Sequence, residues 1–474
     1  MRPIRALIAV AVAAVVVGAA GLTWPARADS GPRSLRFQPL SGSVLAVAGV
    51  GAYRGDIVVA PGGGGLAVVD DVGFEDYLDG IAEVPPNWPT AALQAQAVAA
   101  RTYALWSMLS RRSTAWSGVG ADICATDACQ VYAGAARDAE PGDAAWMAAV
   151  RATAGQVLLY RGRVIEAMYG SSDGGRTTYG GVPWLPSVND PDDAVSPLHQ
   201  WQWATSLASL DPVLGVPAGY QLTGLRGEGQ VVGVTMQAPD GSAVQEQIGA
   251  SQFHDLLNSR LTPPAGLPLA LPSWRYAVWS QADQAVVQGW GFGHGVGMSQ
   301  YGALGKALRG MDAGSILASY YGLRPTQLSI GQEPTRIRVG LVMGAPGVAV
   351  TSNGPFRVVD GSGRVLAESS GGTWKAVPAG SGVKLVPPSG YTPPAAPAPA
   401  PTTTAAPPPA PPAPAATPLL AAVAPPLPFD RGSRPSGDQR RTPAGPVAAL
   451  AALGLLADAA LIAALGLRPR RLSG

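Results

Sequence analysis

The feature that most constrains the fold is an alanine-rich segment that follows a pair of prolines. Residues 80–105 read GIAEVPPNWPTAALQAQAVAARTYAL. Apolar residues recur through this segment at the spacing of an α-helix, and Thr90, which follows a proline, is a suitable N-terminal cap. Alanine side chains are small enough to let neighbouring backbones approach closely. We therefore predict a central, buried helix that begins near Thr90 and forms a rigid support beneath the turn before it.

A single carboxylate, Glu83, stands at that turn. The prolines that follow, Pro85 and Pro86, prevent the chain from continuing as a helix, so the acid is presented at a helix end. Desolvation by Trp88 and Tyr103 would raise the pKa of this carboxyl, as a general acid at neutral pH requires. A solvated acid that merely ends a helix fits the same residues. On chemistry alone both interpretations stay open.

A glycine-rich stretch, residues 289–302 (GWGFGHGVGMSQYG), is the second candidate site. Its alternating glycines permit close approach of the backbone to a ligand. His294 lies at its centre, and Ser299, Gln300 and Tyr301 follow. A tight turn with a hydrogen-bonded histidine explains the pattern equally well.

The loop YGSSDGGRTTY, residues 169–179, offers several polar groups that can hydrogen-bond a sugar. The candidates for this role are Tyr169, Ser171, Ser172 and Arg176. Asp173 is a speculative second carboxylate in the same loop. The alternative is an ordinary surface loop.

Arg101 falls on the packed side of the predicted helix, in the series of positions 93, 97, 101 and 104. A buried charge needs a partner, because burial without one is costly. A structural salt bridge meets that need. Recognition of a substrate carboxylate, to which a guanidinium is well suited, is the functional alternative.

The rest of the folded region mixes short strands with helices, so we assign an α+β fold. Short alternating runs separated by glycine turns predict strands, and residues 156–169 predict a hairpin that turns at Arg161-Gly162. We expect one domain over residues 29–330 and a small, separate β module over residues 336–386.

Both ends of the chain resemble targeting segments. Residues 1–28 combine a charged start, an apolar core and a small-x-small cleavage site, which is typical of a secretory signal; an uncleaved anchor is the alternative. Residues 392–428 are a Pro/Ala-rich spacer. The apolar run 447–467 predicts a transmembrane helix, and the basic residues 468–474 favour a cytoplasmic tail; an amphipathic tail is the alternative. We therefore expect an exported, single-pass protein at the outer face of the membrane or in the cell wall.

The chain has two cysteines, Cys124 and Cys129. In an exported protein, a pair this close predicts a local disulfide. Free thiols and a metal site are the alternatives, but the histidines His199, His254 and His294 all lie far away in the sequence, so zinc would need distant ligands. We expect neither a metal nor a cofactor.

Several other functions lack support in the sequence. A net charge of +2, with no basic run interleaved with aromatic residues in the folded region, argues against nucleic-acid binding. The sequence has no G-x-S-x-G, H-E-x-x-H or P-loop motif. Glycosidases usually use two carboxylates, and here only Glu83 is well placed.

Four segments together resemble the SpoIID/LytB family, which includes stage II sporulation protein D and the amidase enhancer. They read AEVPPNWPTAALQAQAVAARTYAL, CQVYAG, AVRATAGQVLLYRGRVIEAMYGSSDGGRT and GWGFGHGVGMSQYGALGKAL, and the resemblance runs from about Phe37 to Leu323. It implies a peptidoglycan lytic transglycosylase, which cleaves the MurNAc–GlcNAc bond and leaves an anhydro-muramyl end. Glu83 occupies the place of the family's catalytic acid, although Val84 stands where the family has methionine.

The resemblance also accounts for the single carboxylate. The nucleophile is the sugar's own 6-hydroxyl, so one residue first protonates the leaving oxygen and then assists that hydroxyl. Family members favour glycan strands stripped of stem peptides, and we expect Arg101 and Arg176 to bind the lactyl carboxylates of such strands. His294 and its glycine loop would line the glycan groove.

The chain departs from the family at one point. Some members bind zinc near the CQVYAG block, but no histidine stands beside the cysteines here, so the resemblance does not carry zinc over. A function of a different class also stays open, namely a non-catalytic glycan-binding activator of a cell-wall amidase. A structural wall binder is the third interpretation.

Overall fold

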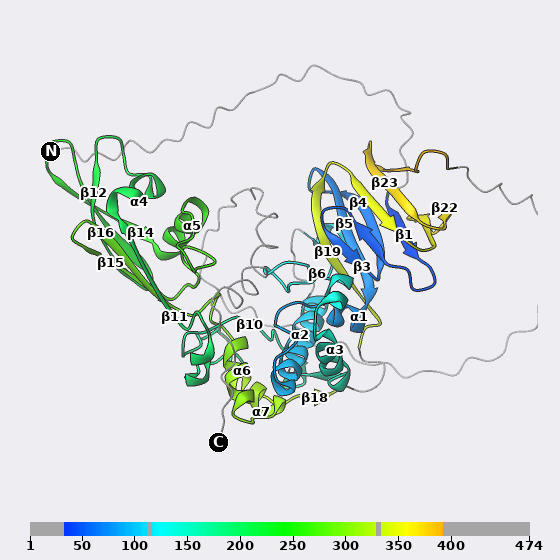
Figure 1. The fold of residues 1–474 in the computed structure, drawn as a ribbon, viewed down its shortest axis with the longest axis horizontal. Coiled ribbons are helices and arrows are strands. Elements are labelled where there is room, and N and C mark those ends of the chain that lie inside the picture. The colour runs from blue at the N-terminus through cyan, green and yellow to red at the C-terminus, as the bar shows by residue number, and fades with distance from the viewer. Residues whose placement is uncertain (1–32, 111–115, 329–332, 392–474) are drawn as a thin grey trace, which may run out of the picture. The chain divides into compact units, whose positions relative to one another are not determined.

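The computed structural model describes residues 33–110, 116–328 and 333–391 (Figure 1). The expected signal peptide, spacer, transmembrane segment and basic tail lie outside the described residues (1–28, 392–428, 447–467 and 468–474). Among the helices that are described, none is both long enough and apolar enough to span a membrane. The described chain divides into two compact units and mixes helices with sheets, which confirms the α+β class.

The first unit is built from two antiparallel sheets and contains residues 33–73, 116–122 and 336–390 of the described chain. One sheet contains, in spatial order, β22 (Val365–Ser369), β21 (Phe356–Asp360), β1 (Leu35–Pro39), β4 (Asp56–Gly62), β5 (Gly65–Gly73) and β19 (Arg336–Ala345). The other contains β24 (Gly382–Val386), β23 (Gly372–Ala379), β20 (Val348–Ser352), β2 (Leu45–Val47) and β3 (Gly51–Tyr53). A short 3-10 helix, η1 (Ser117–Val119), belongs to the same unit.

Residues 336–386 do not form the separate module that the sequence predicted. Strand β19 pairs with β5, β21 pairs with β1, and β20 pairs with β2, so both sheets combine strands from the two ends of the folded chain. A buried carboxylate reinforces this pairing, because Asp71 accepts hydrogen bonds from Arg36 at 2.8 Å and from Arg336 at 2.7 Å. The strand pattern of a sequence does not reveal such long-range partners.

The second unit contains residues 74–110, 123–328, 333–335 and Tyr391 of the described chain, and it has a helical part and a separate sheet. Its helical part contains α1 (Phe74–Asp79), α2 (Thr90–Ser110), α3 (Asp143–Ala152), α6 (Gln300–Leu308) and α7 (Ala313–Tyr321), with the 3-10 helices η2 (Ala135–Ala139) and η3 (Pro191–Val195). Short strands join its loops: β10 (Tyr169–Gly170) pairs with β17 (Met298–Ser299), β7 (Gln156–Val157) with β18 (Thr326–Gln327), and β8 (Leu159–Tyr160) with β9 (Arg163–Val164). A further short strand is β6 (Ile123–Cys124).

Helix α2 is the predicted alanine-rich helix, and it begins at Thr90 as expected. Its small side chains Ala95 and Ala99 are fully buried, in one core with Ile316 and Tyr320 of α7. Side chains this small allow other elements to pack on several sides of α2, which lies centrally among the helices in Figure 1. The predicted hairpin also forms, as β8 and β9, with Arg161 and Gly162 both at positive φ.

The sheet of the second unit has the order β11 (Gln200–Ser206), β16 (Gln284–Trp290), β15 (Tyr276–Gln281), β12 (Gln221–Glu228), β13 (Val231–Gln237) and β14 (Ala243–Gly249), all antiparallel. Helices α4 (Leu207–Leu214) and α5 (Ala250–Arg260) cover one face, where Leu210, Phe253 and Leu257 share a core with Val234 and Val287. Side chains therefore alternate along each strand between this covered face and an open face.

We predict that a chain ending at residue 330 loses the first unit. Strands β1, β2 and β5 would then lack the partners that β19–β24 supply, and the buried side chains Ile337, Val350 and Trp374 would be missing. Limited proteolysis of residues 29–330 and 29–391, followed by mass spectrometry, tests this. We expect rapid cleavage within residues 33–73 in the shorter chain only, and equal protection in both chains would contradict the shared sheets.

Candidate active site around Glu83

Glu83 lies in the short connection between α1 and α2, beside the segment that follows the cysteines. The backbone of this connection pairs with residues 131–133: Ala82 donates to the carbonyl of Val131, and Ala133 donates to the carbonyl of Gly80. The Val131 N–H then donates to Oε1 of Glu83 at 2.7 Å. The backbone around Glu83 is therefore paired with residues 131–133, and its carboxyl is held by the Val131 N–H instead of projecting freely from a helix end.

Two side chains reach Glu83 from distant parts of the sequence. The Tyr169 hydroxyl lies 3.4 Å from Oε1, and Nε2 of Gln300 lies 3.4 Å from Oε2. The hydroxyl of Tyr169 in turn accepts from Nε2 of Gln130 at 2.7 Å, and Oε1 of Gln130 accepts from the buried hydroxyl of Tyr77 at 2.7 Å. Glu83 therefore ends a chain of hydrogen bonds that runs into the interior.

The environment of Glu83 favours the protonated carboxyl. Burial raises its pKa, while the hydrogen bonds from Val131, Gln300 and Tyr169 oppose that shift without cancelling it. Burial and the nearby Glu83 raise the pKa of Tyr169 well above its ordinary value, so this phenol stays neutral and can donate. A carboxyl that can hold a proton, next to donors that stabilise its charged form, is suited to both giving and receiving a proton.

The strand pair β10–β17 places the two side chains that reach Glu83. These strands run parallel, with Tyr169 opposite Met298 and Gly170 opposite Ser299. Tyr169 starts the first strand, and Gln300 follows the second and begins α6. The Ser299 hydroxyl caps that helix by accepting from the Gly302 N–H at 2.9 Å. Both contacts of Glu83 therefore depend on keeping these two strands together.

A buried carboxylate, Asp193 of η3, ties the two loops on which β10 and β17 lie. It is 0% exposed, and five donors surround it. They are the Ser172 hydroxyl (2.7 Å), the backbone N–H groups of Asp173 (3.1 Å) and Gly174 (2.9 Å), the Ser299 hydroxyl (2.7 Å) and Nδ1 of His199 (2.9 Å). Asp193 thus joins residues 172–174 to Ser299 with charge-assisted hydrogen bonds.

A second set of polar groups anchors η3 to the helices. Lys306 of α6 pairs with Asp190, and it also lies 3.3 Å from Asp192. Asp190 accepts from the hydroxyl of Tyr320 on α7 as well. Asp173 lies close to this group, and burial together with Asp190 and Asp193 raises its pKa to about 8. This environment favours the protonated form of Asp173, which is a member of this network rather than a second free carboxylate.

The glycine-rich loop brings His294 against the same strands. Its Nδ1 accepts from the Val296 N–H at 3.0 Å, and its half-buried ring has a pKa lowered by burial, so the imidazole is neutral with the proton on Nε2. A Cβ at Gly170 would lie 3.6 Å from the ring. At Gly297, φ is +77° and a Cβ would meet the Met168 carbonyl at 1.9 Å, so only glycine fits.

Aromatic side chains border the turn that holds Glu83. The rings of Trp88, just after the prolines, and Tyr301 of α6 meet edge to face with centroids 5.2 Å apart. Trp88 therefore contacts the helix that supplies Gln300.

Comparison with known proteins identifies the family. A family described as "SpoIID: Stage II sporulation protein" matches residues 62–160, which include Glu83, Arg101 and both cysteines. The chain is 30% identical over 276 residues to stage II sporulation protein D of Bacillus subtilis, a match that covers 55% of this chain and 76% of that protein. The chain belongs to the SpoIID/LytB family.

Two further relatives extend this comparison. The chain is 27% identical over 303 residues to the amidase enhancer of Bacillus subtilis, covering 50% of this chain and 38% of that protein. It is 30% identical over 277 residues to an uncharacterized protein of Brachyspira hyodysenteriae, covering 57% of this chain and 70% of that protein. The likeness to SpoIID/LytB proteins therefore extends well beyond residues 62–160.

Arg101 of this SpoIID/LytB chain does not face a substrate, which corrects the functional prediction for that residue. Its side chain is 0% exposed, and the guanidinium donates to both oxygens of Glu75 (3.2 and 3.0 Å) and to the carbonyls of Thr153 (2.8 Å) and Val150 (3.1 Å). An oxygen of Glu333 also lies 3.3 Å from Nε of Arg101. Arg101 therefore joins α1, α2 and the end of α3, as the structural alternative expected.

Most of the other residues predicted to contact a substrate instead bond to the protein itself. Ser172 and Ser299 are buried and bind Asp193, so they position the loops and do not contact a substrate. Ser171 acts through its carbonyl, which accepts from the Tyr301 N–H at 3.0 Å. Arg176 is exposed and its Nε donates to the Ser187 hydroxyl at 3.0 Å. Of the predicted residues, Tyr169 and Gln300 reach Glu83, while His294 lies against Gly170 and Tyr301 packs on Trp88.

Sequence reasoning missed three residues that shape the site: Tyr77, Gln130 and Asp193. Gln130 lies in the CQVYAG block that marks the family, which was the one available signal. Cys124 and Cys129 form a disulfide, with Cα atoms 5.5 Å apart, directly before Gln130 and Val131. The described residues contain no group of three or more His, Cys, Asp or Glu side chains arranged to hold a metal ion.

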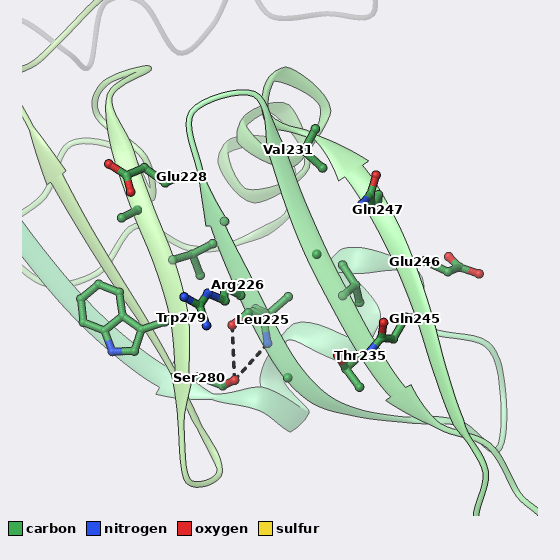
Figure 2. Close-up of a pocket in the computed structure, with 16 residues that line it drawn as sticks. Leu225, Arg226, Glu228, Val231, Thr235, Gln245, Glu246, Gln247, Trp279 and Ser280 are labelled. Atoms are coloured by element: carbon green, nitrogen blue, oxygen red, sulfur yellow. Dashed lines mark hydrogen bonds between the residues drawn. The ribbon is translucent and has the colours of Figure 1, made fainter.

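An open hollow of about 1200 Å³ lies elsewhere in the second unit, on the open face of the six-stranded sheet (Figure 2). It is lined by residues of β12–β15, including Arg226, Trp279 and Gln247. None of its lining residues surrounds Glu83, so it is a distinct surface.

We predict that Asp193→Ala lowers the free energy of unfolding by about 3 kcal/mol or more, because several buried donors lose their acceptor and each unsatisfied group costs roughly 1–3 kcal/mol. Asp193→Asn keeps one acceptor oxygen and should cost less. Urea unfolding measures both variants against Glu246→Ala, which removes an exposed acid on β14 and should change little. Equal stability of Asp193→Ala and the control would show that Asp193 does not hold the two loops together.

Proposed function

We propose that this SpoIID/LytB protein is a peptidoglycan lytic transglycosylase with Glu83 as its acid and base. The protonatable Glu83 carboxyl, next to the neutral donors Tyr169 and Gln300, is the observation that carries this proposal. The substrate is the MurNAc–GlcNAc bond of glycan strands, in particular strands stripped of stem peptides. The protein acts as an exported enzyme at the outer face of the membrane or in the cell wall, with its C-terminal segment as the anchor.

The proposed reaction uses one carboxyl twice. Glu83 first gives its proton to the glycosidic oxygen, so that the bond between this oxygen and C1 of MurNAc breaks and the GlcNAc end leaves as an alcohol. The carboxylate then takes the proton of the MurNAc 6-hydroxyl as that oxygen bonds to C1. The product is a 1,6-anhydro ring, no water is consumed, and Glu83 regains its proton.

The contacts of Glu83 fit the two halves of this cycle. Between proton loss and proton return, the carboxylate carries a charge in a partly buried place. The Val131 N–H, the Tyr169 hydroxyl and the Gln300 amide all donate toward it, and hydrogen bonds to a charged acceptor are the stronger kind. Burial favours the protonated form and these donors favour the charged form, so the surroundings of Glu83 support both states of the cycle.

The first test compares wild type with Glu83→Gln, using residues 29–391 and amidase-stripped glycan strands. Mass spectrometry counts anhydro-muramyl ends. We expect wild type to make such ends and Glu83→Gln to lose at least about 100-fold of the rate, the lower range for removal of a general acid. Glu246→Gln, a change at an exposed acid, should keep full activity.

Two outcomes of this test would count against the enzyme. Equal rates for wild type and Glu83→Gln would exclude Glu83 as the acid. No ends from wild type, with strand binding intact, would favour a non-catalytic activator of a cell-wall amidase. The amidase enhancer among the relatives is the observation that favours this second function. Stimulation of an amidase by Glu83→Gln at the wild-type level would support it.

The pH dependence gives an independent check. Because the acid must be protonated, kcat/KM should fall on the alkaline side as Glu83 loses its proton, at a pH above the ordinary pKa of a glutamic acid. Tyr169→Phe removes a donor that favours the charged form, so the pKa of Glu83 should rise and the alkaline limb should move to higher pH. A pH–rate profile of both proteins measures the shift, and a limb that stays in place or moves to lower pH would contradict it.

A further inference from the structure

Trp274 is a large aromatic side chain left exposed beside the glycine-rich loop. The residue is 47% exposed, and it lies in the segment that leads into β15. Ser273 forms a parallel bridge with Gly293, and the Gly293 N–H donates to the carbonyl of Pro272 at 3.0 Å. The segment that holds Trp274 is therefore fixed alongside the backbone that leads into His294.

A short series of neighbouring residues connects this position to the candidate active site. His294 follows Gly293 and lies against Gly170, and Gly170 follows Tyr169, whose hydroxyl approaches Glu83. The connection runs through backbone pairs and short contacts within one unit. Trp274 therefore follows His294 in this series of neighbours, farther from Glu83, at a position suited to the extended part of a polymeric substrate.

The indole ring is held in place before any ligand arrives. One face stacks on His254 of α5, with ring centroids 3.9 Å apart and planes 16° apart. Asn258 fixes this histidine, because its Nδ2 lies 3.1 Å from Nε2 of His254. Asn258 is itself fixed by two hydrogen bonds with the backbone of Leu271, at 2.8 and 3.0 Å. Burial lowers the pKa of His254, so the ring beneath the indole is a neutral imidazole.

A ring fixed in this way is suited to one class of ligand. His254 covers one face and nearly half of the residue is exposed, so part of the indole is accessible to a flat, partly apolar group. No described residue makes a hydrogen bond with Nε1 of Trp274, so a polar donor lies at the edge of the apolar face. A sugar ring presents C–H groups on its face and hydroxyls on its rim, which matches this combination. A prearranged ring also loses little conformational entropy on binding.

We propose that Trp274 is a sugar-stacking subsite, which binds the glycan strand beyond the residues around Glu83. This inference rests on the substrate of the proposed function but not on its reaction. The subsite contributes to binding of long strands and takes no part in proton transfer. His254 and Asn258 hold the indole ring in place for this stacking.

The chain supplies a matched control on the strand that follows Trp274. Trp279 lies on β15, in which Tyr276 and Val278 belong to the covered core while Trp279 lines the hollow on the open face (Figure 2). Trp279 is a second partly exposed tryptophan, five residues after Trp274, but it lines the hollow on the open face, whereas Trp274 stacks on His254 of α5. Removal of each ring therefore distinguishes a subsite at Trp274 from general aromatic attraction and from strand binding in that hollow.

The experiment measures binding of amidase-stripped glycan strands to the full chain carrying Glu83→Gln, so that no cleavage occurs. Adding Trp274→Ala should weaken the affinity for strands of several disaccharides about tenfold and leave the affinity for a single disaccharide unchanged. Trp274→Phe should keep most of the affinity, and Trp279→Ala should match the parent protein. In the active enzyme, Trp274→Ala should raise KM for long strands and leave kcat unchanged.

The possible results show whether Trp274 binds the glycan strand. Unchanged strand affinity in Trp274→Ala would falsify the subsite, and loss in Trp279→Ala alone would move strand binding to the open face. Loss of amidase stimulation by Trp274→Ala, with strand affinity intact, would make Trp274 a protein-docking residue instead. If wild type makes no anhydro-muramyl ends but Trp274→Ala still loses strand affinity, the proposed reaction falls and the subsite stands.

Discussion

The arrangement around Glu83 depends on the Asp193 carboxylate. Its two oxygens accept from Ser172, Ser299 and the backbone of the loop after β10. The most distant of these donors in the sequence, Ser299, is 106 residues from Asp193. A buried carboxylate is costly unless every lone pair has a partner, and here five donors supply that compensation. Because one group bonds both loops, neither loop can shift without leaving a buried charge partly unpaired. That constraint keeps Tyr169 and Gln300 beside Glu83.

A general acid must hold its proton until it reacts and must then release it readily, and the site around Glu83 meets these two requirements with different contacts. Burial keeps a carboxyl protonated, but a carboxyl without donors cannot release its proton readily. The connection between α1 and α2 provides a backbone donor at 2.7 Å, while Tyr169 and Gln300 approach at 3.4 Å, which is long for a hydrogen bond. One contact therefore fixes the direction of the carboxyl, and two looser ones leave room for adjustment when a ligand is present.

Local features of the structure followed from the sequence, and long-range pairings did not. The start of α2 at Thr90 and the hairpin of β8 and β9 depend on residues a few positions apart, so cap and turn chemistry predicted them. The two prolines after Glu83 also predict its position at the end of a short helix, in the connection between α1 and α2. Arg101 was assigned to a substrate because helical spacing shows which side is packed but not which carboxylate lies there. Asp193 lies in the short 3-10 helix η3, which has no motif that marks it in the sequence, and only the fold brings its donors to it.

The chain order explains how a six-stranded sheet can occur beside the site without disturbing it. β10 and β17 are parallel neighbours, and parallel strands need a long crossover connection. Here the crossover is the whole segment between them, which includes β11–β16. The two ends of the part that carries β11–β16 lie side by side, because the Gly291 N–H donates to the carbonyls of Leu198 (3.0 Å) and His199 (3.1 Å). Both ends of this segment are thus fixed to the loops that Asp193 ties, so the six-stranded sheet between them can differ in sequence without moving Tyr169 or Gln300.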